Sequence, residues 1–119
     1  MAELDFEVRE IRGCQVGQPS GEIDMDNAAL LEGRLLGLVD QGHTVLDLSG
    51  VTFLDSTALG AVIVAYRHGQ AVGHNLRLAG AAGWVRRILQ ITELDAVLQH
   101  YDDVDDAVDA LLTGADSTS

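Results

Sequence analysis

Apolar and polar residues alternate with a period of two near the start of the chain. Leu4, Phe6 and Val8 alternate with charged residues, which is typical of a strand with one buried face. A second, more polar strand is expected over residues 14–18. Pro19 is expected to end that strand in a turn with Gly21, because proline lacks the N–H group that a strand ladder needs.

Short apolar runs farther along the chain predict three more strands. Residues 44–48 and 76–79 form such runs, and each is followed by glycine or a polar residue. Residues 97–100 predict a last strand at the edge of the sheet. The pattern therefore indicates about four to five strands.

Apolar residues at a spacing of three and four predict about four helices between and after these strands. Asp24 or Asp26 can cap the first helix, and acidic residues precede the last one, where they complement the helix dipole. The four predicted helices cover residues 24 or 26 to about 39, 56–72, 84–91 and 104–111.

Strands alternate with helices from Cys14 onward, and this order favours a single α/β domain. We expect a mixed, mostly parallel sheet in which the first strand is antiparallel to its neighbour. The domain is expected to span residues 1–113. Residues 114–119 are small and polar, and they are expected to form a disordered tail.

Composition narrows the classes of function. The chain has 119 residues, of which 47% are hydrophobic and 22% charged, so it is long enough and apolar enough to fold as one domain. Its 19 acidic and 7 basic residues give a net charge of −12, which disfavours direct binding of nucleic acid or of an anionic membrane surface. A partner with a basic or mixed surface fits this charge better.

No membrane insertion and a cytoplasmic location are expected. No apolar stretch approaches the length of a spanning helix, and no signal peptide precedes the first strand. The single cysteine, Cys14, cannot form an internal disulfide and fits a reducing compartment.

The most informative stretch runs from Val45 to Gly60. A buried strand is followed by Asp55, Ser56 and Thr57, and an apolar helix face then begins at Leu59. Asp55 or Ser56 can accept hydrogen bonds from the first turn of that helix. The hydroxyl group of Ser56 is thus either a plain helix cap or a group on which chemistry is done.

Several chemical readings of these residues are disfavoured. A nucleophilic Ser56 would need a base, and the residues two positions away are not the glycines of a nucleophile elbow. The four histidines show no metal-ligand spacing, and Cys14 lacks a partner ligand. We therefore predict no catalytic residue, no metal site and no cofactor.

A second loop is expected beside Ser56. Gly21, Glu22, Ile23 and Asp24 follow the predicted second strand, and in a sheet built from crossover units this end points the same way as the end before Asp55. Taken alone, the segment indicates a turn and a helix cap. Taken together, the two loops form one place at the carboxyl edge of the strands where a site can lie.

The residues Gly-Glu-Ile-Asp at 21–24 and Leu-Asp-Leu-Ser-Gly-Val-Thr-Phe-Leu-Asp-Ser-Thr-Ala-Leu-Gly at 46–60 resemble the STAS domain. Within that family the chain is most similar to the bacterial anti-sigma factor antagonists. The resemblance covers residues 6–112 and is strongest over residues 45–60. It implies a single STAS-type domain and a protein that binds other proteins and is not an enzyme.

The resemblance also implies a phosphorylation switch. The unphosphorylated form would bind an anti-sigma factor with serine kinase activity and so release a sigma factor, and phosphorylation of Ser56 would end that binding. A serine/threonine phosphatase would reverse the modification. The partner-binding residues implied are Glu22, Asp24, Asp55, Ser56, Thr57, Leu59 and Gly60.

Three features depart from the family pattern, and two other functions stay open. Ala58 stands where glycine is usual, the second strand at residues 14–19 is more polar and interrupted than is usual, and Thr57 is a second hydroxyl group beside Ser56. The chain could instead be a constitutive STAS scaffold of a transporter or signalling assembly, with no phosphorylation, or a serine hydrolase. The sequence leaves the oligomeric state open.

Overall fold

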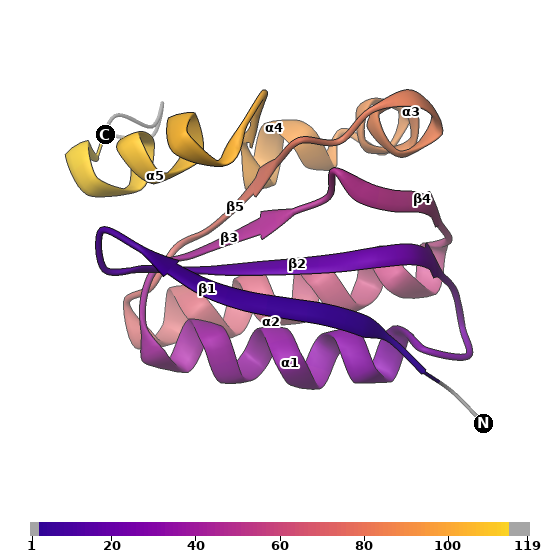
Figure 1. The fold of residues 1–119 in the computed structure, drawn as a ribbon, viewed down its shortest axis with the longest axis horizontal. Helices are drawn as coiled ribbons and strands as arrows, with labels where there is room; N and C mark the ends of the chain where they lie inside the picture. The colour runs from indigo at the N-terminus through magenta and orange to yellow at the C-terminus, as the bar shows by residue number, and fades with distance from the viewer. Residues whose placement is uncertain (1–2, 115–119) are drawn as a thin grey trace.

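In the computed structural model, which describes residues 3–114, the first two strands form a hairpin at the start of the sheet (Figure 1). Strand β1 (Asp5–Ile11) pairs with β2 (Cys14–Ile23) in antiparallel register from Asp5 opposite Ser20 to Ile11 opposite Cys14. Arg12 and Gly13 form the two-residue turn, with φ of 50° and 85°. Two positive φ angles give a turn whose twist matches that of the strands.

The second strand is longer than the sequence predicts. It continues past Pro19 to Ile23, so the expected turn at residues 19–21 is wrong. Proline is tolerated because β2 changes neighbours at this point: Gln15 to Gly17 pair with one strand, and Ser20 to Ile23 pair with another. Pro19 lies between these two ladders, where its missing N–H removes no pairing.

The remaining strands extend the sheet on the far side of β2. Strands β3 (Thr44–Asp47) and β4 (Gly50–Leu54) both pair with β2, β5 (Leu76–Ala79) pairs with β3, and β6 (His100–Tyr101) pairs with β5. All of these pairings are parallel, whereas that of β1 with β2 is antiparallel. The predicted α/β class with a mixed, mostly parallel sheet is confirmed.

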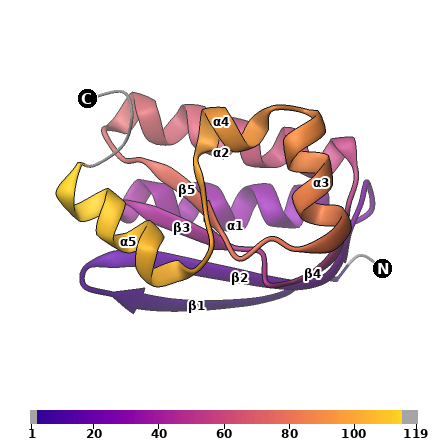
Figure 2. The same cartoon turned by 90° about the horizontal axis from the view of Figure 1, so that it is seen from above.

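Helices cover both faces of the sheet (Figures 1 and 2). Helices α1 (Ala28–Gln41) and α2 (Ser56–Val72) lie side by side on one face. Helices α3 (Gly83–Ile91), α4 (Leu94–Leu98) and α5 (Val104–Thr113) lie on the other. Residues 3–114 thus hold six strands and five helices, one of each more than the upper number expected. The predicted tail falls on residues 114–119: Gly114 ends α5 in a left-handed conformation, and residues 115–119 lie outside the described residues.

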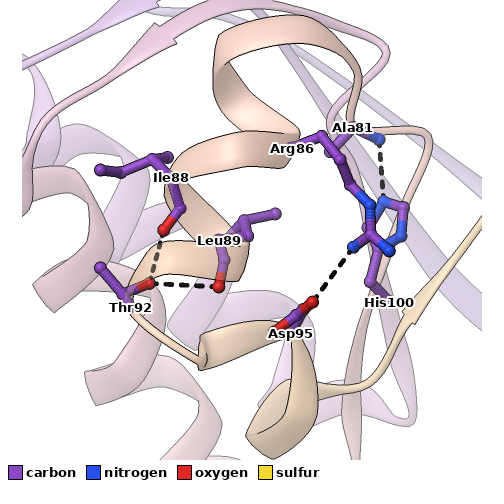
Figure 3. Close-up of polar contacts among 7 residues, drawn as sticks. All are labelled: Ala81, Arg86, Ile88, Leu89, Thr92, Asp95 and His100. Carbon is purple, nitrogen blue, oxygen red and sulfur yellow. Dashed lines mark hydrogen bonds and ion pairs between the residues drawn. The ribbon is translucent and has the colours of Figure 1, made fainter.

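The strand predicted at residues 97–100 is largely wrong. Val97 and Leu98 belong to helix α4, Gln99 follows the helix, and β6 begins only at His100. Polar contacts join α4 and β6 to their surroundings (Figure 3): Asp95 Oδ2 of α4 lies 3.5 Å from Arg86 Nη1, and His100 Nε2 of β6 accepts the Ala81 amide over 3.0 Å. Thr92 Oγ1 donates to the carbonyl groups at the end of α3. These contacts join residues up to 19 positions apart, which local periodicity does not report.

The core has two parts. The larger joins the apolar faces of α1 and α2 to the sheet and to α3 and α4, with Leu31, Leu35 and Leu46 fully buried. The smaller lies between the sheet and α5, around Cys14 and Val108. Among residues 3–114, no helix combines the length and hydrophobicity that a bilayer crossing requires.

Candidate functional site

The ends of β2 and β4 meet at one edge of the sheet. Ile23 lies opposite Leu54 in the parallel ladder, and the Asp55 amide donates to the Ile23 carbonyl oxygen over 3.2 Å. The loop after each strand then leads into α1 or α2. The predicted proximity of the two loops is confirmed, and this carboxyl edge is where sheets of this kind place their sites.

Asp55, and not Ser56, caps helix α2. Asp55 has extended backbone angles, its Oδ1 accepts the Ala58 amide over 2.9 Å, and its carbonyl oxygen accepts the Leu59 amide over 3.1 Å. This settles the choice that the sequence left open. Because Asp55 satisfies the first turn, the hydroxyl group of Ser56 is not needed for capping.

Ser56 is the first residue of α2 and is exposed, as is Thr57. Its hydroxyl group makes no hydrogen bond to any residue between positions 3 and 114. The first N–H groups of a helix lack partners within the helix, and the helix dipole favours an anion there. The hydroxyl group is therefore accessible from solvent at a place where added negative charge is locally tolerated.

The loop after β2 is organised by Asn27, a residue that the sequence pattern did not single out. Asn27 Oδ1 accepts the Asp24 amide over 2.9 Å, and Nδ2 donates to the carbonyl oxygens of Glu22 and Glu3 over 3.0 and 3.1 Å. Asp24 Oδ1 accepts the Asp26 amide over 2.9 Å. Asn27 precedes α1, so the predicted capping of this helix by Asp24 or Asp26 is wrong. The aspartate and asparagine residues spaced through 24–27 are the signal that could have predicted such a loop.

Gly21 shapes the approach to this loop. Its φ is +84°, and the pairing of β2 with β4 shifts register between Gly21 and Glu22. An irregularity of this kind bends a strand and redirects the residues that follow it. Gly21 is therefore part of a bulge inside β2 and not part of a turn that ends the strand.

The remaining predicted site residues differ in their access to a partner. Glu22 is exposed and Asp24 half-buried, whereas Leu59 is 6% exposed and packs into the core. Gly60 is half-buried, with open space where a side chain would lie. Met25, which carries no signal in the sequence pattern, is 73% exposed in the same loop as Asp24.

The charged residues of the two loops at the site are all acidic. Glu22, Asp24, Asp26 and Asp55 belong to the two loops, and none of them forms an ion pair with a residue in the described part of the chain. The carboxylates are held by backbone N–H groups or face solvent. The surface around Ser56 is therefore acidic without compensation by a nearby base.

The histidines make their contacts elsewhere. The rings of His43 and His74 pack edge to face with centroids 5.7 Å apart, His68 contacts Asp40, and His100 accepts the Ala81 amide. None of these contacts includes Ser56. As far as residues 3–114 are concerned, no histidine is thus placed as the base that a nucleophilic serine needs.

Comparison with known proteins decides the family. The family model described as the STAS domain matches residues 5–107, which is most of the chain. The chain belongs to the STAS domain family. The anti-sigma-B factor antagonist of Bacillus subtilis (strain 168) is 30% identical to this STAS domain over 80 residues, which cover 66% of the chain and 73% of that protein.

Solved structures agree with this assignment. An anti-sigma factor antagonist from Mycobacterium paratuberculosis superimposes with a TM-score of 0.77 at 32% identity, covering 92% of this chain and 94% of that one. The Bacillus cell fate determinant SpoIIAA in its phosphorylated form gives a TM-score of 0.65 at 19% identity, covering 88% and 97%. At 19% identity, the similarity to SpoIIAA shows a shared fold and nothing more. The family prediction is confirmed, and the chain belongs with relatives named as anti-sigma factor antagonists.

Proposed function

We propose that this STAS domain is an anti-sigma factor antagonist whose binding is switched off by phosphorylation of Ser56. The observation that carries the proposal is the position of Ser56: an exposed hydroxyl group on the first residue of α2, not needed for capping because Asp55 takes that role. The names of the similar proteins from Bacillus subtilis and Mycobacterium paratuberculosis support the partner class.

A phosphate on Ser56 leaves the fold intact. It adds about −1.5 to −2 charges and three acceptor oxygens, and a helix N-terminus offers free N–H groups and a favourable dipole. Because the Ser56 hydroxyl group holds no other residue of the described chain, its modification breaks no contact. SpoIIAA supports this at the level of the fold, since a protein of the same fold exists in phosphorylated form.

The same phosphate opposes binding. Glu22, Asp24 and Asp26 already make the adjoining loop acidic, so a phosphate concentrates more negative charge in one place. Unfavourable charge pairs across an interface cost several kcal/mol, and about 1.4 kcal/mol is a factor of ten in affinity. Losing two or three times about 1.4 kcal/mol of binding free energy weakens binding by roughly a hundredfold to a thousandfold. The switch then needs no refolding.

The partners proposed are those that the resemblance to anti-sigma factor antagonists implies. An anti-sigma factor with serine kinase activity binds the unphosphorylated loops at Asp24 and Ser56 and uses Ser56 as its substrate, and a serine/threonine phosphatase restores the binding form. In this scheme the chain is a kinase substrate and not an enzyme, and it acts in the cytoplasm. Thr57 and Glu22 lie on the contact surface, whereas the buried Leu59 supports the start of α2 from beneath.

Substitutions at Ser56 test the switch. Ser56→Ala should bind the anti-sigma factor of the same organism as tightly as the wild type and should take up no phosphate from ATP. Ser56→Asp, which carries one negative charge, should bind roughly tenfold or more weakly, since one charge gives part of the effect of a phosphate. Isothermal titration calorimetry measures the affinity, and intact-mass spectrometry measures phosphorylation.

Thr57→Val is the matched control, because it removes the neighbouring exposed hydroxyl group and leaves Ser56 in place. It should still take up one phosphate, on Ser56, whereas Ser56→Ala should take up none. Equal affinity of Ser56→Ala, Ser56→Asp and the wild type would favour the constitutive scaffold instead. Covalent labelling of Ser56 by a fluorophosphonate probe would support the hydrolase and contradict the proposal.

A further inference from the structure

One edge of the sheet is formed by β1. Strand β1 is the first in the order β1-β2-β3-β5-β6 and, within residues 3–114, pairs with β2 alone. It lies along the rim of the molecule, on the side away from α2 (Figure 2). Five of its seven residues are exposed, with Val8 at 48% in the middle. An unpaired strand of this length is a template for another strand.

The hairpin turn determines which backbone groups face that edge. In a two-residue hairpin the flanking residues, Ile11 and Cys14, exchange hydrogen bonds, and bonded and non-bonded pairs then alternate along the ladder. Phe6, Val8 and Glu10 fall at the non-bonded positions, so their N–H and C=O groups point outward. Among these outward groups, the Phe6 carbonyl oxygen accepts from Arg34 Nη2 over 3.4 Å.

In one register, the charges on β1 of one copy are complementary to the charges on β1 of a second copy. If a second copy pairs antiparallel with Val8 opposite Val8, all seven residues of each strand find partners, and Glu7 of each copy lies opposite Arg9 of the other. Such directly opposed, non-hydrogen-bonded pairs bring side chains closest together. A shift by two residues in either direction places Arg9 opposite Arg9, or Glu7 opposite Glu7. The register with the greatest overlap is thus the one without like charges at its centre.

A groove beside β1 receives a second charge pair in the same register. Phe6 lies opposite Glu10 of the second copy, and the Arg34 guanidinium stacks 5.0 Å from the centroid of the Phe6 ring. The groove has a volume of about 310 Å³ and is lined by Leu4, Phe6, Ala29, Leu30, Gly33 and Arg34. In this register we expect the methylene groups of the incoming Glu10 to lie against Phe6 and Leu30, which is 43% exposed, and its carboxylate to lie near Arg34.

We propose that β1 is a homodimerisation edge, on which two copies of the chain join their sheets by antiparallel pairing of residues 5–11 centred on Val8. The interface contains two Glu7–Arg9 pairs and two Glu10–Arg34 pairs, related by the twofold axis. It uses none of the residues of the Ser56 site, so the proposal does not depend on the function proposed above.

Charge-reversal variants test the register. Sedimentation velocity measures the oligomeric state. Salt at about 0.15 M screens the repulsion between two copies of net charge −12. The wild type should pass from monomer to dimer between about 10 and about 500 µM, the range of a weak specific contact. Glu7→Arg and Arg9→Glu should each raise the dimer dissociation constant roughly tenfold or more, because each places like charges opposite one another twice. An equimolar mixture of the two variants should form a heterodimer, since each of these pairs then joins a basic side chain of one variant to an acidic side chain of the other.

Two exposed valines provide a matched control. Val8→Lys places two lysines at the twofold axis and should abolish the dimer, whereas Val72→Lys, at a residue 45% exposed on the last turn of α2, should leave it unchanged. Circular dichroism melts establish that each variant is folded. Arg9 Nη2 lies 3.9 Å from Asp47 Oδ2, so if Arg9→Glu fails to fold, Arg9→Gln takes its place in the mixture with the same expected direction.

Amide exchange gives a readout at single residues. The outward N–H groups of Val8 and Glu10 should become protected as concentration rises, while those of Glu7 and Arg9, which bond β2, should be protected at every concentration. A wild type that stays monomeric over the whole range would overturn the proposal. Dimerisation that survives Val8→Lys or Glu7→Arg would overturn it equally, because the contact would then lie elsewhere.

Discussion

The accessibility of Ser56 depends on its neighbours at single positions. Asp55 provides the cap of α2, and Ala58, which is fully buried, supplies the amide that the cap binds. In the loop opposite, one side chain, Asn27, holds three backbone groups at once. The two loops are therefore held by the side chains of Asp55, Asp24 and Asn27, and the exposed side chains of Ser56 and Met25 take no part in these bonds.

Asn27→Ala should destabilise the protein and loosen the loop before α1. The substitution removes three hydrogen bonds and leaves the Asp24 amide unpaired, so a loss of about 1–3 kcal/mol in the free energy of unfolding is expected. Urea denaturation followed by circular dichroism measures it. Asn75→Ala is the control, because Asn75 Oδ1 accepts a single side-chain bond, from Gln70. Equal losses in the two variants would contradict the role assigned to Asn27.

At the scale of elements, β2 connects the edge strand to the site. It holds β1 on one side and both β3 and β4 on the other, and its change of neighbour near Pro19 is followed by the bulge at Gly21. After the bulge, Ile23 at the end of β2 lies beside Asp55, the residue that caps α2. A regular strand through Gly21 would carry the following residues on in line, away from this position.

Gly21→Ala should cost about 1–2 kcal/mol of stability. No atom lies within 4 Å of the position of the added methyl group, so the cost comes from the positive φ alone. Gly37→Ala gives the control, because that position is equally open but lies inside α1, where alanine is favoured by up to about 1 kcal/mol. The melting temperature should therefore fall for the first variant and rise for the second. A rise for both would mean that the bulge at Gly21 relaxes without cost.

At the scale of the whole molecule, two histidines hold the strand that follows α2. His43 Nδ1 accepts the Asn75 amide over 2.9 Å before β5, and His100 Nε2 accepts the Ala81 amide over 3.0 Å after it. Both roles need an unprotonated ring nitrogen. Burial lowers the pKa of His43, with His74 and Arg77 adding to the effect, and burial with the nearby Arg86 lowers the pKa of His100.

Stability should consequently fall on mild acidification. The unfolded chain binds protons at these histidines near their ordinary pKa of about 6.5, whereas the folded chain does so only at lower pH. The two histidines make their full contribution to the free energy of unfolding above about pH 6.5. This contribution is lost as the pH falls toward their lowered pKa values in the folded chain. Urea midpoints measured across this range test the expectation. A double variant with His43→Gln and His100→Gln should show a smaller decrease, and an unchanged decrease would assign the effect to other groups.

Local pattern predicted the elements whose stability is local. The helices α1 and α2, the alternating β1 and the strands β3 and β5 were predicted because buried faces recur with the period of the element. The order of strands and helices indicated a mostly parallel sheet, and Asp55 followed by Ser56 indicated the site. The signal for each single element and for the site lies within that segment of sequence, and the order of elements is read directly along the chain.

The wrong predictions of secondary structure lie where contacts with distant segments determine the local conformation. Proline by itself disfavours the continuation of a strand. Strand β2 nevertheless continues through Pro19, because β3 pairs with β2 before this residue and β4 pairs with β2 after it. Residues 97–100 look like a strand, but contacts of Asp95 with Arg86 and of His100 with Ala81 favour α4 and a shorter β6. Asn27 and Met25 were missed because their significance depends on which loop packs beside them.

The sequence by itself thus determined the fold class, the family and the phosphate-accepting candidate Ser56, because periodicity and the residues at 45–60 are local properties. Tertiary structure alone decided that Asp55 and not Ser56 is the cap, that Asn27 holds the loop before α1, that β2 continues past Pro19 and that, within residues 3–114, β1 is left as a free edge. The physical reason is that burial and strand pairing are properties of pairs of distant segments, and a single segment does not specify its neighbour.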